Sequence, residues 1–261
     1  MRTLVFLNLV ILSAVPMQSQ GNQLEHPLKT SGLWTQTNHY SSNPESEIIV
    51  PYQFCLSSEP ICVKATATPT VQHSGYNFTT RVKDYGLTFL LVEVTRTDEN
   101  AGWSGVDFKI EWSIYTGSGA FYQGHLIWLP VRTDGSYRDK KTAETECSNA
   151  GDGYLVDLEN EDMYDVVYDY VSRTYVSSSN FNHVSVWLGS TYDVVTHTVT
   201  KSDGTPGYYG SWKNGGLFPS NVTAMTHMYI KVGIGSDPAT TVGISNTWAN
   251  IRVLPLCSKT I

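Results

Sequence analysis

The spacing of four cysteines is the feature that most limits how this chain can fold. Cys55 and Cys62 are seven residues apart, whereas Cys147 and Cys257 are 110 residues apart. An even number of cysteines is typical of disulfide-bonded proteins from oxidising compartments, and four cysteines allow three pairings. The spacing favours Cys55–Cys62 as a tight local loop and Cys147–Cys257 as a long closure, which in the chain-entropy model stabilises a fold by about 4–5 kcal/mol. It does not resemble the paired motifs of a zinc site.

The first twenty residues have the pattern of an export signal. Arg2 supplies a positive start, residues 4–15 are apolar, and the small residues Ser19 and Gly21 suit a cleavage site. No later segment approaches the ~18 consecutive apolar residues of a membrane helix. We therefore expect residues 1–20 to be a signal peptide and the mature chain, of roughly 240 residues, to be secreted and soluble, with one large domain or two small ones.

The charge of the chain bears on its partners. The net charge is −7, and loss of Arg2 with the leader makes the mature chain about −8. No lysine- or arginine-rich patch offsets this charge, so nucleic acid and anionic lipid are unsuitable partners. Two sequons, at Asn77 and Asn221, fit glycosylation of a secreted protein.

Residues 24–115 have the texture of an all-β domain. Val106, Phe108, Ile110 and Trp112 alternate with polar residues, as in a strand with one buried face. With no good helix in this segment, we expect a β-sandwich. The stretch GLTFLLVEVTRTDENAGWSGVDFKIEWSIY resembles the last two strands of a CUB domain, and an unrelated sandwich is the alternative. The following residues, 116–123, are rich in glycine and predict a linker.

The chain after this linker predicts an α+β domain. Residues 141–150 can be helical and contain Cys147. A second helix follows Asn160, a candidate cap, with acidic residues in its first turn. Its apolar residues recur at helical spacing, and short strands follow it. These apolar residues are Met163, Val166, Val167, Tyr170 and Val171.

The order of these parts resembles the C-type lectin-like domain. A cysteine in a first helix is followed by GYLVDL, a second helix, VWLGS, SDGTPGYYGSW, a tryptophan near the end, and LPLC. The family pattern has "LVxI", "WIGL", "SDGxPxxYxNW" and a final "FxC" at the matching places. The resemblance covers residues 124–261, about half of the chain. It implies an α+β fold with two helices and small antiparallel sheets, in which Cys147–Cys257 staples the domain.

The resemblance also implies a ligand site at the long loop. Calcium-dependent sugar binders of the family carry "EPN" or "QPD" in this loop and "WND" near the end, whose oxygens bind the metal and the sugar. The matching residues here are Phe218-Pro219-Ser220 and Trp248-Ala249-Asn250. Because no carboxylate remains in either motif, calcium is not expected and the domain is expected to need no cofactor.

The family's inner cysteine pair is also missing, at places near Tyr229 and Val253, where an apolar contact could replace it. The stretch SDGTPGYYGSWKNGG must then be held in another way. Its rings, with Trp248, either anchor the loop or line an exposed patch that contacts a protein or glycan. The residues expected to bind the ligand are Trp212, Phe218, Ser220, Trp248 and Asn250.

Enzymatic chemistry is not indicated. Asp162, Asp165 and Asp169 fall on one polar helix face. None of the seven histidines has metalloprotease spacing, and no nucleophile motif is present. The sequence predicts a secreted recognition protein that binds an extracellular glycan or glycoprotein through the long-loop face. The alternative is an adhesion or matrix component that binds other proteins or itself.

Overall fold

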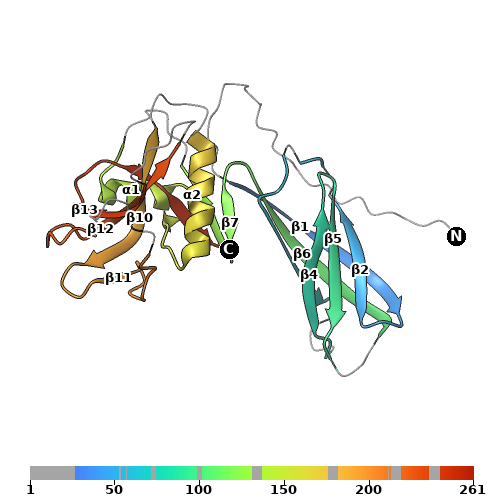
Figure 1. Ribbon diagram of the computed structural model, residues 1–261. Coiled ribbons are helices and arrows are strands. Elements are labelled where there is room, and N and C mark those ends of the chain that lie inside the picture. Colours follow the sequence, from blue (N-terminus) through green and yellow to red (C-terminus); the bar gives the residue numbers. More distant parts are fainter. Residues whose placement is uncertain are drawn as a thin grey trace.

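The computed structural model describes residues 27–52, 54–56, 58–71, 75–98, 102–130, 137–175, 182–210, 212, 219–234 and 242–261. The expected signal peptide and Phe218 lie outside these residues. Figure 1 shows two parts, a β-rich part formed by the first half of the chain and a mixed part that carries both helices. We call them the N-terminal β-domain and the C-terminal domain.

Within the part of the chain that the structure describes, the N-terminal β-domain has two three-stranded antiparallel sheets, in the orders β1-β6-β3 and β2-β5-β4. Both sheets contribute to one apolar core, as alternating strands with one buried face require. The all-β character expected here is confirmed for the described residues, whereas the CUB resemblance stays a prediction. The strands are β1 (Leu28–Ser41), β2 (Glu45–Pro51), β3 (Cys62–Pro69), β4 (Phe78–Tyr85), β5 (Phe89–Arg96) and β6 (Trp103–Thr116).

Strand β6 shows why this domain could be recognised from its sequence. Val106, Phe108, Ile110 and Trp112 are all buried, as their alternation predicted. Each such side chain contributes about 1.5–3 kcal/mol through burial. Opposite Trp112, strand β1 carries Gly32, where any Cβ would overlap the indole ring.

In its described residues, the C-terminal domain combines two helices with two small sheets. One sheet has the order β7-β8-β15-β9; the other has the order β11-β10-β12-β13, with β14 parallel to β10. Pairing of β8 with β15 joins the two ends of the domain. The elements are β7 (Ala120–Tyr122), β8 (His125–Trp128), α1 (Lys140–Asn149), β9 (Tyr154–Leu155), α2 (Glu161–Tyr175), β10 (His183–Asp193), β11 (Thr198–Thr200), β12 (His227–Gly233), β13 (Gly243–Thr247), β14 (Leu254–Pro255) and β15 (Cys257–Thr260).

Both predicted helices are confirmed, and side chains fix where they begin. Asp139 accepts a hydrogen bond from Thr142 N at 2.8 Å before α1. Asn160, the predicted cap of α2, accepts one from Met163 N at 2.9 Å. Such caps stabilise a helix by about 1 kcal/mol. The apolar stripe of α2 faces the core, with Val166 only partly buried; Met163, Val167, Tyr170 and Val171 are buried.

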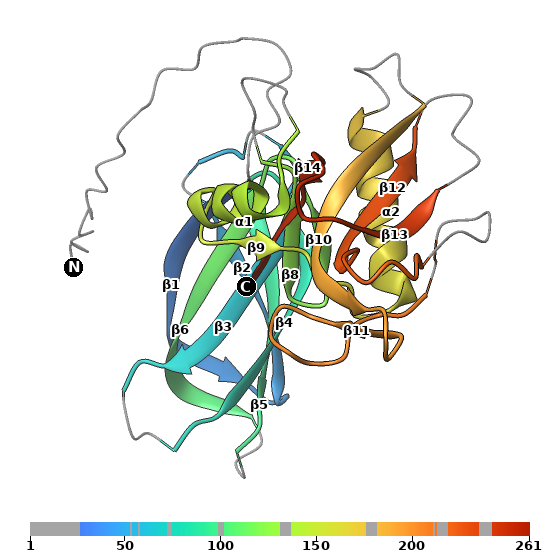
Figure 2. The same cartoon turned by 90° about the vertical axis from the view of Figure 1, so that its left-hand side faces the viewer.

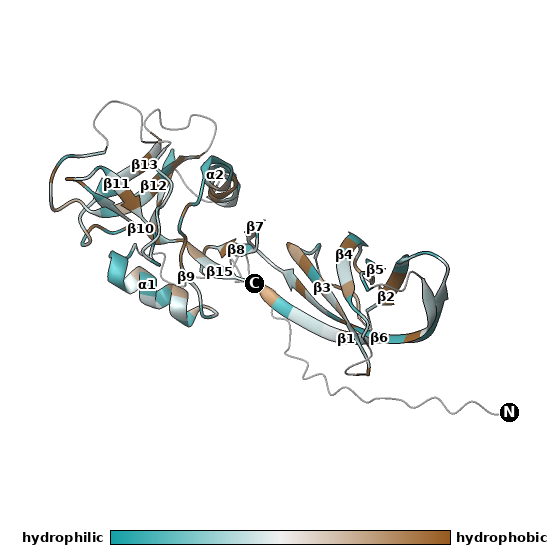
Figure 3. Cartoon of the chain, turned by 90° about the horizontal axis from the view of Figure 1, so that it is seen from below, coloured by the Kyte–Doolittle hydropathy of each residue, from teal (hydrophilic) through white to brown (hydrophobic). Residues whose placement is uncertain are grey.

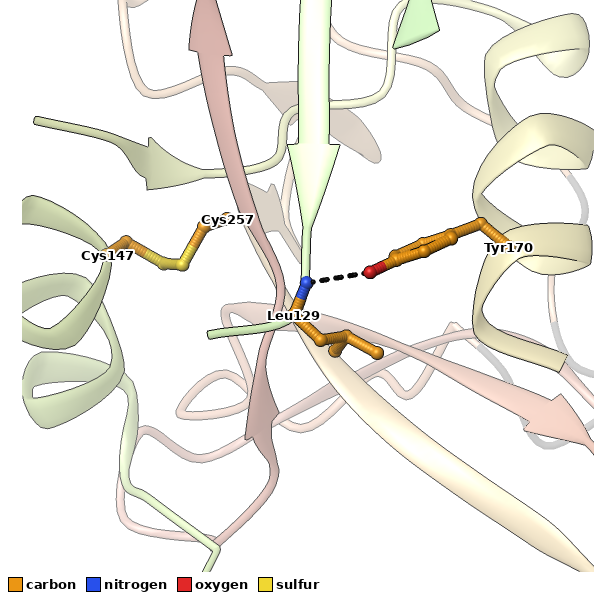
Figure 4. The surroundings of a disulfide bond; sticks show 4 residues. All are labelled: Leu129, Cys147, Tyr170 and Cys257. Carbon is orange, nitrogen blue, oxygen red and sulfur yellow. Dashed lines mark hydrogen bonds between the residues drawn. A yellow bond between two sulfur atoms is a disulfide. The ribbon is translucent and has the colours of Figure 1, made fainter. Parts of the chain in front are cut away.

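The long disulfide is present, joining Cys147 in α1 to Cys257 in β15 (Figure 4). On the other side of β8, the Tyr170 hydroxyl of α2 accepts a hydrogen bond from Leu129 N at 3.1 Å. Burial raises the pKa of this tyrosine. The two ends of the domain are therefore tied to both helices.

The expected Cys55–Cys62 disulfide is wrong, because both residues are free thiols. Cys62 begins β3 and is buried opposite Tyr115. The exposed Cys55 precedes Leu56, whose N–H donates to Leu87 O between β4 and β5. The two cysteines are thus held by different sheets despite their short separation in sequence.

The expected linker at 116–123 is also shorter than predicted. Residues 120–122 form β7, and Ala120 and Tyr122 pack against the core of the C-terminal domain. Only residues 117–119 separate β6 from β7. Glycines on both sides of residues 120–122 made this short strand look like part of a linker in the sequence.

The two parts meet in one apolar cluster, with the C-terminus close to their junction (Figures 1 and 3). Cys62 and Tyr115 come from the N-terminal β-domain, and Leu126 and Trp128 come from β8. Ile61 and Ile261 pack against the same cluster. The junction is therefore a packed interface around a short connection.

Candidate functional site

The five residues expected to form the long-loop face differ in how far they are buried and in what holds them. Phe218 lies outside the described residues. Trp212 is partly buried against the core of the C-terminal domain and forms a parallel bridge with Ile244 of β13. Its ring centroid lies 5.2 Å from that of Tyr192 and 5.5 Å from that of Tyr209, with both ring pairs edge-to-face. Such pairs stabilise a fold, so Trp212 anchors the loop.

Ser220 is held in place by a residue that sequence reasoning missed. Asn246 in β13 is buried, and its Oδ1 accepts a hydrogen bond from Ser220 N at 2.7 Å. Its Nδ2 donates to Ser220 O at 2.9 Å and to Met225 O at 2.7 Å. Three of its four hydrogen-bonding positions are thus used on one segment. The sole sequence signal was a polar residue at the end of the strand GISNT.

Trp248 and Asn250 follow β13 and are exposed. Trp248 keeps 45% of its surface accessible to solvent. Their backbone is nevertheless anchored, because Ala249 O accepts a hydrogen bond from Lys140 N at the start of α1. An exposed aromatic ring and a neutral amide thus stand on a fixed segment.

The loop rings divide into two groups. Tyr208 packs against Tyr164 of α2, with ring centroids 6.5 Å apart, and its N–H donates to Leu158 O. Tyr208 and Trp212 therefore act as anchors. Tyr209, by contrast, is 50% exposed.

The positions of the missing inner cysteine pair are joined by apolar packing. Tyr229 of β12 and Val253 belong to one cluster with the buried Trp187. The rings of Trp187 and Tyr229 lie 6.4 Å apart, edge to face. Packing thus links the same two segments that a disulfide would join.

A polar network supports the start of the stretch SDGTPGYYGSWKNGG at Ser202. Lys140 Nζ donates to Gly189 O at 2.7 Å and lies 3.3 Å from Ser190 O. Burial lowers the pKa of this lysine. Ser190 Oγ donates to Asp157 Oδ1 at 2.7 Å, and Asp157 Oδ2 accepts from Ser202 N at 3.0 Å. The network links α1, β10 and the loop at Ser202.

The same network explains the glycine in the VWLGS motif. A Cβ at Gly189 would lie 2.7 Å from Leu155 O and 2.8 Å from Asp157 Oδ1. Leu155 belongs to β9, and the Asp157 carboxylate accepts hydrogen bonds from Ser190 and Ser202. Neither atom can therefore move aside easily. This position therefore requires a residue without a side chain.

Other expected sites are placed on the surface. Asn77 and Asn221 are exposed, so both sequons are accessible, while their glycosylation stays a prediction. Asp162, Asp165 and Asp169 are exposed on α2, and Asp169 pairs with Arg173 at 2.7 Å. The polar helix face expected from their spacing is confirmed.

A metal site needs several donor side chains close together. Within the described ranges, no group of three or more histidine, cysteine, aspartate or glutamate side chains could hold a metal ion. At the long-loop face, the Ser220 and Asn250 side chains offer a hydroxyl and an amide. Neutral donors alone do not balance a divalent cation.

The comparisons with known proteins give limited information. No protein-family model and no curated protein matches the chain. Among solved structures, the carbohydrate-recognition domain of mouse scavenger receptor C-type lectin is similar at a TM-score of 0.37 and 15% identity, over 55% of this chain and 94% of that one. The C-type lectin CEL-I from Cucumaria echinata has a TM-score of 0.41 and 13% identity, over 55% and 96%. The tailspike of Pseudomonas phage phi297 has a TM-score of 0.27 and 9% identity, over 34% and 15%.

Among the helices of the described residues, none is long and apolar enough to cross a membrane.

Proposed function

We propose that this protein is a secreted recognition protein whose C-terminal domain is C-type lectin-like and binds an extracellular glycan or glycoprotein without calcium. Its long-loop face is the proposed contact surface, and catalysis is not part of its function. The observation that carries the proposal is the exposed Trp248 ring beside Asn250, on a backbone fixed through Ala249 O.

The exposure of the Trp248 ring supports the proposed glycan binding, because an exposed aromatic ring does not gain the full free energy of burial. An indole that is 45% exposed forgoes part of its burial energy, although Trp212 of the same face is packed inward. Large rings on a preorganised surface are the residues that dominate binding energies in interfaces. The neighbouring amide of Asn250 and the hydroxyl of Ser220 can both donate and accept hydrogen bonds. That combination suits a sugar, which has an apolar ring face and hydroxyl groups.

The absence of carboxylates from both motifs favours binding without calcium. The backbone of Ser220 is also held in place, since both its N–H and its C=O form hydrogen bonds with the Asn246 side chain. Hydrogen bonds within the protein therefore shape this segment, which is what the proposed binding without calcium requires.

The test is a glycan array probed with the mature protein, once with Ca²⁺ and once with EDTA. We expect the same glycans to be bound in both conditions. Trp248→Ala should weaken binding about tenfold or more, as for a central aromatic contact. Tyr40→Ala is the matched control, because Tyr40 is 68% exposed on β1 of the N-terminal β-domain. Binding that EDTA abolishes would contradict the calcium-free mode.

A second candidate function is adhesion through protein contacts, including self-association. It is favoured by exposed apolar side chains on the sheet β2-β5-β4 and the turn next to it, namely Ile49, Tyr85 and Leu87. Sedimentation equilibrium separates the two candidates. A concentration-dependent oligomer that Ile49→Asp dissolves, together with a blank glycan array, would favour adhesion.

A further inference from the structure

A recess of about 420 Å³, lined by residues with polar or charged side chains, opens at one end of the sheet β7-β8-β15-β9. Its position follows from the strand pattern. His125 and Thr260 are paired across β8 and β15, and they share a sheet face with Ile127, which belongs to the core. At the end of the strands the same face is thus polar instead of apolar. None of the residues expected at the long-loop face lines this recess.

The side chains around the recess form a chain of donors and acceptors. The Tyr154 hydroxyl lies 2.8 Å from Thr260 Oγ1 and 3.3 Å from His125 Nδ1. His125 Nε2 lies 3.5 Å from Glu159 Oε1. Lys201 Nζ lies 3.9 Å from Glu159 Oε1 and 3.8 Å from Asp203 Oδ2.

The charged groups are close without being in direct contact. Hydrogen bonds of this type measure about 2.7–3.2 Å between heavy atoms, so the two lysine–carboxylate pairs are looser than that. The carboxylate oxygens and the ammonium group therefore retain bonding capacity that a hydroxyl-bearing molecule can use. Side-chain exposures of 34% for Glu159 and 19% for Lys201 make both groups reachable from solvent.

The walls of the recess are fixed by the surrounding backbone. Asp157, which also lines it, binds Ser202 N with one oxygen and Ser190 Oγ with the other. The turn after β11 is closed by Lys201 N donating to Thr205 O at 2.8 Å. Asp203 Oδ1 accepts from Thr205 Oγ1 at 2.6 Å and Thr205 N at 2.9 Å, which holds the pKa of Asp203 low. A site with such support binds with little loss of conformational freedom.

The chemistry of the lining selects among ligand classes. A metal ion is disfavoured by the lysine ammonium between two carboxylates. An anion would be repelled by Asp157, Glu159 and Asp203. A neutral polyhydroxyl ligand can bind both the negative and the positive groups of the recess, because a hydroxyl can donate to a carboxylate and accept from the lysine ammonium. Tyr154 is 37% exposed and presents a ring surface to the C–H groups of such a ligand.

We propose that this recess is a second binding site and that it takes a neutral saccharide residue. Glu159 and Lys201 bind its hydroxyls and Tyr154 contacts its ring. The volume lies within the range of small-molecule sites, about 300–1,000 Å³. The inference rests on the proposed function, since both concern glycans, but it depends on different residues.

The test is an NMR titration of the ¹⁵N-labelled mature protein in EDTA. The probes are methyl α-mannopyranoside, methyl β-galactopyranoside and N-acetylglucosamine. We expect at least one sugar to shift the amide signals of Tyr154, Glu159 and Ser202. Glu159→Gln and Lys201→Met should each raise Kd about tenfold, as for loss of a hydrogen bond to a charged group. Glu161→Gln, an exposed glutamate in the first turn of α2, is the matched control.

Further variants separate this inference from the proposed function. Trp248→Ala should leave the recess titration unchanged, and Tyr154→Phe should retain the ring contact while removing the hydroxyl. Melting temperatures equal to that of the unmodified protein establish that each variant is folded. Sugar binding that depends on Trp248 but not on Glu159 or Lys201 would overturn the inference and leave the proposed function standing. Absence of amide shifts with all three sugars would also overturn it.

Discussion

The N-terminal β-domain, which consists of strands, and the C-terminal domain, which combines helices and strands (Figure 2), are stabilised in different ways. In the first, regular strands place one apolar side chain after another in a shared core. In the second, long irregular segments are held by single groups: the disulfide Cys147–Cys257, the buried amide of Asn246 and the carboxylate of Asp157. Stability in the first domain thus comes from one regular core, whereas the second domain adds these few long-range attachment points to an apolar core of its own. Loops that carry a binding surface need such points, because they bury little apolar area of their own.

Removal of the disulfide should give the largest effect and should act on one domain. Cys147→Ser opens a loop of 110 residues, which costs about 4–5 kcal/mol in the chain-entropy model. We expect the C-terminal domain to unfold at lower temperature while the N-terminal β-domain keeps its amide protection. Hydrogen exchange with mass spectrometry measures both domains at once. Equal loss of protection in both domains would contradict their separate stabilisation.

The matching perturbation of the N-terminal β-domain is Phe108→Ala. Phe108 is fully buried between Trp103 and Phe78, at ring distances of 5.2 and 5.6 Å. We expect a loss of about 3–5 kcal/mol from cavity formation. Lys109→Ala, the next residue on the outer face, is the control and should change stability little. Chemical denaturation with tryptophan fluorescence gives both values, and similar losses for the two variants would show that β6 has no buried face.

A smaller effect is expected at the long-loop face. Asn246→Ala leaves Ser220 O and Met225 O without their donor, at a cost of about 1–3 kcal/mol. Asn250→Ala, four residues along, removes an exposed amide and should be nearly neutral in stability. Thermal unfolding of the two variants measures the contrast. If Asn246→Ala, which leaves the proposed contact residues in place, also weakens glycan binding, the buried amide is needed to shape the surface.

The contrast between the domains also explains which parts were predictable from the sequence. The buried face of β6 and the stripe of α2 repeat at periods of 2 and 3.6 residues, so they could be identified without neighbours. The cap Asn160 was readable for the same local reason. Asn246, Lys140 and Asp157 were not, because their partners lie far away in the chain and a single polar residue has no period. The recess at Glu159 and Lys201 combines segments about forty residues apart, and spacing alone does not reveal such a pairing.

The smallest effect concerns the two cysteines whose pairing was predicted wrongly. Cys55 is exposed and Cys62 is buried, and burial raises the pKa of the Cys62 thiol. A thiolate is the reactive form, so Cys55 should be alkylated quickly in the native protein and Cys62 only after unfolding. Cys55→Ser should change the free energy of unfolding by less than about 0.5 kcal/mol, as for an exposed surface substitution. Two alkylated thiols in the denatured, unreduced protein confirm the pairing seen in the structure. Zero alkylated thiols, together with a clear loss of stability in Cys55→Ser, would restore the short disulfide and give the N-terminal β-domain a covalent anchor of its own.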